Sequence, residues 1–269
     1  MNIHPKPAQT VAASLAMYDR DQTRDAHDRF WAAIRDGLRD KGHAAPENLT
    51  RGEQAFWPAW TAPGLLLSQT CGYPYRARLH GQVSLVGTPD YGLPDCPPGF
   101  YRSVFVARRD DPRASPADFS GARFAFNEPM SQSGWAAPQS FAAARGLQFP
   151  PTLCTGAHWL SAMAVVEGRA DFAALDAMSW SMMVRWDHFA QDLKVVGFTD
   201  LTPGLPLSTG QAELVGTLFA VISAAIAGLS NRDRDLLSLR GLIKIDQAAY
   251  LAVPTPPSPD KCEVALRLT

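Results

Sequence analysis

The segment Phe124–Gly134 constrains most strongly how this chain folds. A short apolar run, Phe-Ala-Phe, ends in a polar turn that holds two serines and a glutamine, and a helix-like run follows Gly134. Such a turn gathers unpaired backbone N–H groups and the positive end of the helix dipole. Ser131 and Ser133 can cap the helix or turn their hydroxyls outward, and we expect Gly134 to let a ligand approach the backbone closely. The turn therefore predicts a site for a small oxyanion.

Strand-like and helix-like segments alternate along the chain, which predicts α/β lobes built on a mostly parallel sheet flanked by helices. Ligands of open α/β sheets bind beyond the carboxyl ends of the strands. Polar or aromatic residues stand at five such predicted ends, whereas the strand bodies are apolar: Tyr18, Gln69–Tyr73, Thr88–Tyr91, Asn127–Ser133 and Asp176. These five ends are expected to gather around one small ligand.

The composition excludes several kinds of partner. The formal net charge of the 269 residues is −1, so no basic field argues for nucleic acid or an anionic membrane. The four cysteines have no C-x-x-C spacing, so we expect no metal and no cofactor. Four separate thiols are favoured over a disulfide such as Cys71–Cys96, which stays open as an alternative.

No signal peptide is expected at the start of the chain, because residues 1–10 are polar and Val11–Met17 is short and mixed. No apolar run reaches the roughly 18–20 residues of a membrane span, and Val215–Leu229 is predicted to be a buried helix.

The polar turn and four other segments resemble the phosphate/phosphite/phosphonate family of type II periplasmic binding proteins. The turn is similar to that family's Asp/Asn-x-Pro-x-Ser-x-Ser-Gly pattern. The other segments follow in the family's order: Tyr101–Val106, Ser115–Gly121, Gly156–His158 with Val166–Asp171, and Leu175–Asp176. The resemblance covers roughly residues 60–200 and is weak over the last 60.

This resemblance implies a two-lobed fold with a ligand cleft between the lobes. Lobe one would hold residues 1–100 and 200–269, and lobe two residues 101–199, with hinge crossings near 101–104 and 196–200. The implied function is capture of a phosphate-, phosphite- or phosphonate-like oxyanion by hinge closure, for an ABC uptake system. The chain would act as a monomer without a chemical step, with an ABC permease as partner.

The resemblance also implies which residues bind the ligand. Ser131, Gln132, Ser133 and Gly134 would hold the oxyanion, and His158 would add a donor. Tyr18, Tyr73 and Asp176 would select among ligands. A carboxylate such as Asp176 accepts hydrogen bonds, so it favours an oxyanion that still carries a proton, or a cationic ligand group. Asp176 could instead be an ordinary helix cap.

Three alternatives stay open. Cys71, His158 and Asp176 are the residue types of a Cys-His-Asp hydrolase, although no hydrolase signature accompanies them. The chain could also be a cytoplasmic enzyme or a ligand sensor built on the same fold. The family resemblance indicates the periplasm, whereas the expected lack of a signal peptide leaves the cytoplasm possible.

Overall fold

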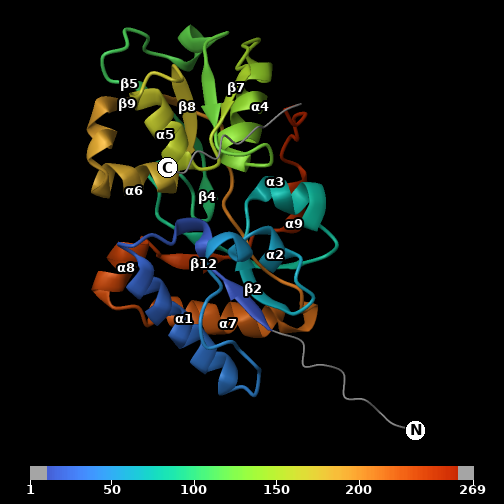
Figure 1. The fold of residues 1–269 in the computed structure, drawn as a ribbon. Helices are drawn as coiled ribbons and strands as arrows, with labels where there is room; N and C mark the ends of the chain where they lie inside the picture. Colours follow the sequence, from blue (N-terminus) through green and yellow to red (C-terminus); the bar gives the residue numbers. More distant parts are fainter. Residues whose placement is uncertain (1–10, 260–269) are drawn as a thin grey trace. The chain divides into compact units, whose positions relative to one another are not determined.

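A computed structural model describes residues 11–259, and in it the chain forms two compact units (Figure 1). The first unit contains the described residues up to Thr70, Arg78–Tyr91 and Leu205–Ile245. The second contains Cys71–Ala77, Gly92–Gly204 and the described residues from Asp246 onward.

The first unit is built on a five-stranded sheet within the described residues. Its strands lie in the order β1 (Ala12–Ser14), β2 (Leu65–Gln69), β11 (Leu207–Thr209), β3 (Ser84–Asp90) and β12 (Gly241–Ile243). β1 and β2 are parallel, whereas β11 is antiparallel to both of its neighbours and β12 is antiparallel to β3. The helices of this unit are α1 (Arg24–Arg39), α2 (Trp57–Trp60), α7 (Val215–Ala227) and α8 (Asn231–Leu237).

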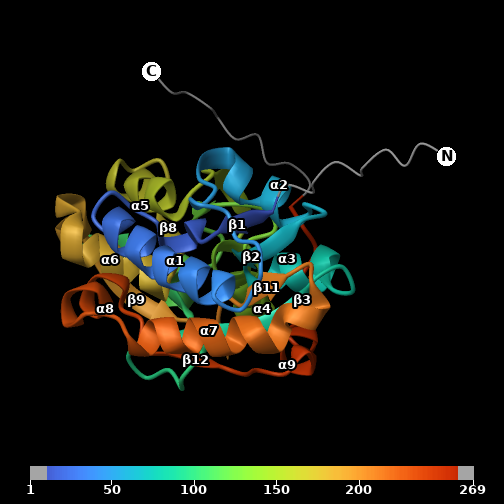
Figure 2. The ribbon, with the colours of Figure 1, turned by 90° about the horizontal axis from the view of Figure 1, so that it is seen from below.

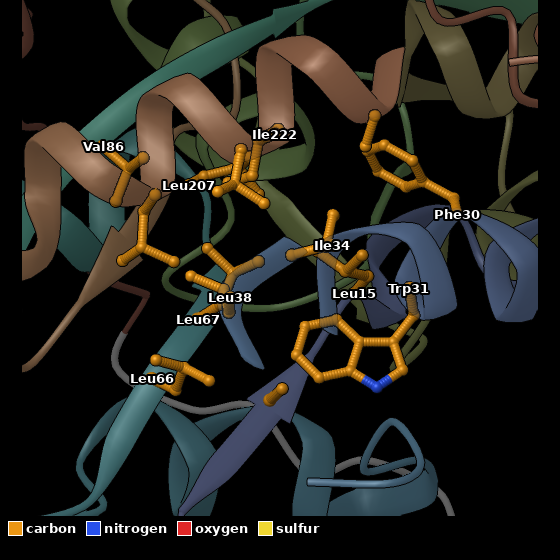
Figure 3. Packing of buried hydrophobic residues seen from close by; sticks show 14 of the residues in the cluster. Leu15, Phe30, Trp31, Ile34, Leu38, Leu66, Leu67, Val86, Leu207 and Ile222 are labelled. Carbon is orange, nitrogen blue, oxygen red and sulfur yellow. The ribbon is translucent and has the colours of Figure 1, made fainter. Parts of the chain in front are cut away.

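Helix α1 lies beside α7, and both contribute to the core of the first unit (Figure 2). Phe30, Ile34 and Leu38 recur every four residues along α1, so they share one face and are all buried. They pack in one cluster with Leu67 of β2 and Ile222 of α7 (Figure 3). The helix period that is visible in the sequence therefore predicts this core correctly.

The second unit is built on another five-stranded sheet, again within the described residues. Its order is β7 (Pro151–Cys154), β6 (Phe124–Phe126), β8 (Phe172–Asp176), β5 (Ser103–Arg108) and β9 (Leu193–Phe198). β6 is parallel to β7 and β8, whereas β5 is antiparallel to β8 and β9. The longer helices are α4 (Ala137–Ala144), α5 (His158–Val166) and α6 (Ala177–Trp186). Shorter elements are α3 (Gly72–Pro74), β4 (Phe100–Tyr101), β10 (Thr202–Pro203) and α9 (Gln247–Leu251).

Strand β5 separates two hydrophobic clusters of the second unit. Phe105 belongs to a cluster rich in phenylalanine, whereas Val104 and Val106 belong to a cluster of smaller aliphatic side chains. Successive strand residues point to opposite faces of a sheet, so both faces here are covered. The polar turn therefore follows a strand of a sheet that is buried on both faces.

Two expectations about the fold need correction. The sheets are mixed and not mostly parallel, because an antiparallel strand is inserted in each: β11 between β2 and β3, and β5 between β8 and β9. The division of the chain also differs from the expected lobes. Residues 71–77, 92–100, 200–204 and the C-terminal stretch from Asp246 belong to the second unit. There β4 pairs with β10, and Tyr250 Oη of α9 donates to the Gly204 carbonyl at 3.1 Å.

No single helix among residues 11–259 is long and apolar enough to cross a membrane, although the bent pair Ala212–Ala227 and Asn231–Leu237 passes by length and composition only.

Candidate oxyanion site

The polar turn follows β6, as expected, and leads into a helix that begins with a wide turn. Residues Gln132–Ala136 form a π-helical turn, which continues into α4. Ser131 is the N-cap, and its Oγ accepts a hydrogen bond from the Gly134 backbone N–H at 2.9 Å. Isolated π-turns of this kind are frequent at functional sites. Residues 131–136 are all buried, so polar groups here are shielded from water.

Gly134 is required by the packing of the turn itself. A Cβ on this residue would lie 1.9 Å from Asn127 Oδ1 and 3.2 Å from Ser131 Oγ. Its backbone N–H already donates to Ser131, and so this group is not available to a ligand. The expectation that Gly134 provides an open approach for a ligand is therefore replaced by an internal reason for the glycine.

Ser133 connects the turn to two neighbouring elements. Its Oγ lies 2.9 Å from Nε2 of His158, the first residue of α5. Its backbone carbonyl accepts a hydrogen bond of 2.8 Å from Ser103 Oγ, at the start of β5. Burial lowers the pKa of His158 to about 4, and the carbonyl of Ala174 opposes this shift. The imidazole is therefore neutral at physiological pH, and it contacts Ser133 as a neutral group.

Several buried polar side-chain atoms at this site have no partner at normal hydrogen-bond distance among the described residues. Among them are Nε2 of Gln132 and Oη of Tyr101, and Ser133 lies beside the latter. Gln132 is 1% exposed and Tyr101 is 3% exposed. A buried polar group without a partner costs about 1–3 kcal/mol, so such groups usually have a ligand or an ordered water as their partner.

Asp176 lies at the end of β8 and caps α6. Its Oδ1 accepts from the backbone N–H groups of Met178 and Ser179 at 2.8 and 2.9 Å. The capping role that the sequence left as an alternative is thus observed. Asp176 is also only 2% exposed, and its carboxylate interacts electrostatically with Cys71 and Tyr101. The carboxylate therefore places negative charge beside the same buried donors.

Burial and the nearby carboxylate act on the two other titratable groups of this cluster. Burial first and Asp176 second raise the pKa of Cys71 to about 12. Burial, followed by Cys71 and Asp176, raises the pKa of Tyr101 well above its ordinary value. Both groups are protonated at physiological pH.

The two tyrosines expected at the site lie in different units. Tyr73 belongs to the second unit, where its Oη donates to the Pro256 carbonyl at 3.2 Å and contacts Ser258 Oγ at the same distance. Tyr18 belongs to the first unit, where its ring packs edge-on against Tyr91 with centroids 5.0 Å apart. A role for either residue in ligand selection stays a prediction.

The cysteines do not behave as four separate thiols. Cys154 is disulfide-bonded, whereas Cys71 and Cys96 are not, and Cys262 lies outside the described residues. The prediction of four separate thiols is therefore wrong for Cys154, and the alternative disulfide Cys71–Cys96 does not form. Cysteine spacing alone cannot reveal which thiols meet.

The sequence did not point to Tyr101, Ser103 or Arg76 as site residues. Tyr101 ends β4 and Ser103 begins β5, which pairs with β8 so that Ser103 lies opposite Asp176 in the ladder. Arg76 Nη1 donates to Gln132 Oε1 at 2.6 Å. A signal existed for Tyr101 and Ser103, which lie in the family-like segment Tyr101–Val106, and for Arg76, which lies three residues after the polar strand end Gln69–Tyr73.

Among the described residues, no group of three or more His, Cys, Asp or Glu side chains could hold a metal ion.

Comparisons with known proteins identify the family and the fold of this chain. The family model described as "ABC transporter, phosphonate, periplasmic substrate-binding protein" matches residues 67–250. No curated protein matches the sequence. Among solved structures, PhnD1 from Prochlorococcus marinus in complex with methylphosphonate is 18% identical, with a TM-score of 0.68 over 90% of this chain and 95% of that one.

Two further structures are similar. A Xanthomonas citri protein bound to ATP is 15% identical, with a TM-score of 0.66 over 90% of this chain and 93% of that one. A binding protein component of an ABC phosphonate transporter from Pseudomonas aeruginosa is 16% identical, with a TM-score of 0.65 over 87% and 80%. These likenesses confirm the expected two-lobed type II fold. The family match covers more than half of the sequence, and so the chain belongs to the periplasmic substrate-binding proteins of phosphonate ABC transporters.

Proposed function

We propose that this chain binds a small phosphonate- or phosphate-like oxyanion at the turn Ser131–Gly134. The observation that carries the proposal is the pair of buried donors without acceptors at normal hydrogen-bond distance among the described residues, Gln132 Nε2 and Tyr101 Oη. A tetrahedral oxyanion offers several acceptor oxygens at once, so one ligand satisfies both donors. The binding role itself follows from the family.

The serines of the turn supply the next polar groups. Ser131 Oγ accepts from Gly134, which leaves its hydroxyl hydrogen for a ligand oxygen. His158 is neutral and has one ring N–H, which the Ala174 carbonyl attracts, so its Nε2 accepts from the Ser133 hydroxyl, whose oxygen can then accept the proton of a ligand. His158 would then act by orienting Ser133. Neutral donors can hold an anion in this way because a buried site strengthens each hydrogen bond.

Asp176 supplies selectivity in this proposal. Its carboxylate lies near the protonated Tyr101 and Cys71 and can accept a hydrogen bond from a ligand that carries a proton. Hydrogen phosphate and a phosphonate monoanion carry that proton at neutral pH, whereas sulfate does not. Sulfate would meet the repulsion of an ionised carboxylate.

We propose further that no chemical step follows binding. A nucleophilic cysteine needs a lowered pKa, whereas burial and Asp176 raise the pKa of Cys71 to about 12. His158 Nε2 is engaged by Ser133. The residues of the hypothetical Cys-His-Asp triad are therefore better explained as parts of a binding site.

The setting that we propose is the periplasm, with an ABC permease as partner and a monomeric binding protein. The disulfide at Cys154 suits an oxidising compartment. Capture by lobe closure would reduce the radius of gyration in solution scattering when ligand is added. An unchanged radius of gyration with saturating ligand would contradict closure.

The test of the function is calorimetric titration of the purified protein with methylphosphonate, phosphite, phosphate and sulfate. We expect binding of at least one of the first three and weak or absent binding of sulfate. Ser133→Ala should weaken binding by roughly tenfold to a hundredfold, the value of a hydrogen bond to a charged group. Ser181→Ala, on the exposed side of α6, is the matched control and should bind as the wild type does. Absence of binding to all four anions would overturn the proposal.

A further inference from the structure

The side-chain amide of Gln132 is held in one orientation. Its Oε1 accepts a 2.6 Å hydrogen bond from Arg76 Nη1, and its Nε2 is buried without an acceptor among the described residues. A guanidinium group has only donors, so the amide atom that faces Arg76 must be the oxygen. The NH₂ group must therefore point away from Arg76, which gives Gln132 the character of a donor.

Arg76 is itself fixed by the C-terminal segment of the described chain. Its Nη2 donates to the Pro254 carbonyl at 2.8 Å, and its Nε donates to Thr255 Oγ1 at 2.6 Å. The guanidinium carbon also lies 4.8 Å from the centre of the Tyr73 ring. Burial lowers the pKa of Arg76 to about 10, so the group remains a cation at neutral pH.

The segment Pro254–Ser258 is docked at further points of the second unit. Tyr73 Oη donates to the Pro256 carbonyl, and Trp135 Nε1 donates to the Pro257 carbonyl at 3.0 Å. Three of its five residues are prolines, which restrict φ and keep the backbone extended. Figure 1 shows this segment in red, leaving α9 and passing α3. We call these five residues the C-terminal strap.

We infer that Arg76 is a positioning residue, which the C-terminal strap holds so that Gln132 presents its NH₂ group to the bound oxyanion. The inference rests on the proposed function and deepens it, because it adds Arg76 and the C-terminal strap to the residues that determine ligand affinity. The charge of Arg76 acts through Gln132: the guanidinium polarises the amide and makes its NH₂ group a stronger donor.

A purely structural role for Arg76 would be to fasten the strap. In that case its contacts with Pro254 and Thr255 matter and its contact with Gln132 does not. The two roles differ in what they predict for ligand affinity at constant stability. They also differ in what they predict for the Gln132 amide signal in NMR.

The test combines calorimetry with ¹H–¹⁵N NMR of the full chain, and the probes are methylphosphonate and inorganic phosphate. Gln132→Glu keeps a partner for Arg76 but has no donor, so binding should fall by more than a hundredfold. Arg76→Met should weaken binding by about tenfold, since the amide can then rotate. Arg76→Lys, which keeps a donor-only cation, should recover part of that loss. Arg78→Met, which changes the exposed neighbouring arginine, is the matched control and should leave affinity unchanged.

The NMR signal gives a readout that a structural role would not move. Gln132→Glu identifies the Gln132 NH₂ pair by its loss. Ligand should shift this pair strongly in the wild type and weakly in Arg76→Met. If the Arg76→Met protein proves unstable, Thr255→Val replaces it. This variant removes one contact between the strap and Arg76, and it should partially weaken both the ligand affinity and the ligand-induced shift of the Gln132 signal.

Wild-type affinity in a folded Arg76→Met protein, with an unchanged shift of the Gln132 signal, would overturn the inference and leave the proposed function intact. Failure of the wild type to bind either probe would overturn both.

Discussion

Gly134 illustrates how one atom decides the shape of the turn. Because a Cβ at this position would lie 1.9 Å from Asn127 Oδ1, Gly134→Ala must displace the asparagine. We expect a loss of about 1–3 kcal/mol in the free energy of unfolding, as in other overpacked sites. Denaturant titration measures this loss.

Asn127→Ala in the same background provides the control. It removes the clashing oxygen, so the double variant should recover at least half of the lost stability, which gives a coupling between the two sites. Two additive losses would mean that the close approach of Asn127 is not the reason for the glycine.

His158 gives the residue-scale prediction on pH. Its pKa is lowered to about 4 in the folded protein, against about 6.5 in an unfolded chain. Below pH 6.5 the unfolded chain therefore binds a proton that the folded protein does not, and stability falls as the pH is lowered towards 4. The loss between pH 7.5 and 5 should be about 2 kcal/mol.

His158→Asn should lack this contribution, so the wild type and the variant should differ in how their unfolding free energies change between the two pH values. His27, whose pKa is also lowered by burial, remains in both proteins and cancels in the comparison. Equal pH dependence in the two proteins would contradict a neutral buried His158.

The local part of the candidate site could be predicted from the sequence, for a physical reason. Ser131, Gln132 and Ser133 form one local turn, and their capping pattern is readable from neighbouring residues. Tyr101 and Arg76 come from distant segments that only the folded sheet and the docked strap bring near. No local pattern encodes such meetings.

At the scale of elements, a substitution at the N-cap of α6 distinguishes the capping role of Asp176 from its proposed role in ligand selectivity. Asp176→Asn keeps a side-chain oxygen for the N–H groups of Met178 and Ser179, and asparagine caps helices as well as aspartate does. The melting temperature should therefore change little. The preference for phosphate over sulfate should narrow by about tenfold, because an amide can also donate and carries no charge.

Paired titrations of phosphate-type ligands and sulfate into the two proteins test this expectation. Unchanged selectivity with unchanged stability would assign Asp176 to the cap alone.

The elements themselves were largely predictable. The apolar run Phe124–Phe126 and the predicted helix Val215–Leu229 are observed as β6 and α7, close to their expected bounds. The inserted strand β11 and the edge strand β12 were not predicted, because each has three residues and is defined by its partners. Short strands carry too little periodicity to be recognised alone.

For the whole molecule, ligand binding should increase the free energy of unfolding. A ligand that binds only the folded protein, at about 100 times its dissociation constant, raises the free energy of unfolding by about 2.7 kcal/mol. We expect this increase with methylphosphonate or phosphate and not with sulfate at the same concentration, measured by denaturant unfolding.

Ser133→Ala should lose about half of that increase or more at the same ligand concentration, because its affinity is roughly tenfold to a hundredfold lower. An equal increase with sulfate would show a general salt effect on stability and not occupation of the site.

The position of β11 in the sequence affects the order in which the two units can fold during synthesis. The ribosome produces β1, β2 and β3 early, yet β11, which joins β2 to β3, is Leu207–Thr209. The sheet of the second unit needs only Ser103–Phe198 and is complete before β11 emerges. The sheet of the second unit can therefore form first. Until β11 is synthesised, β2 and β3 of the first unit lack the strand that pairs with both of them. Chaperones that recognise nascent chains would find their binding segments there.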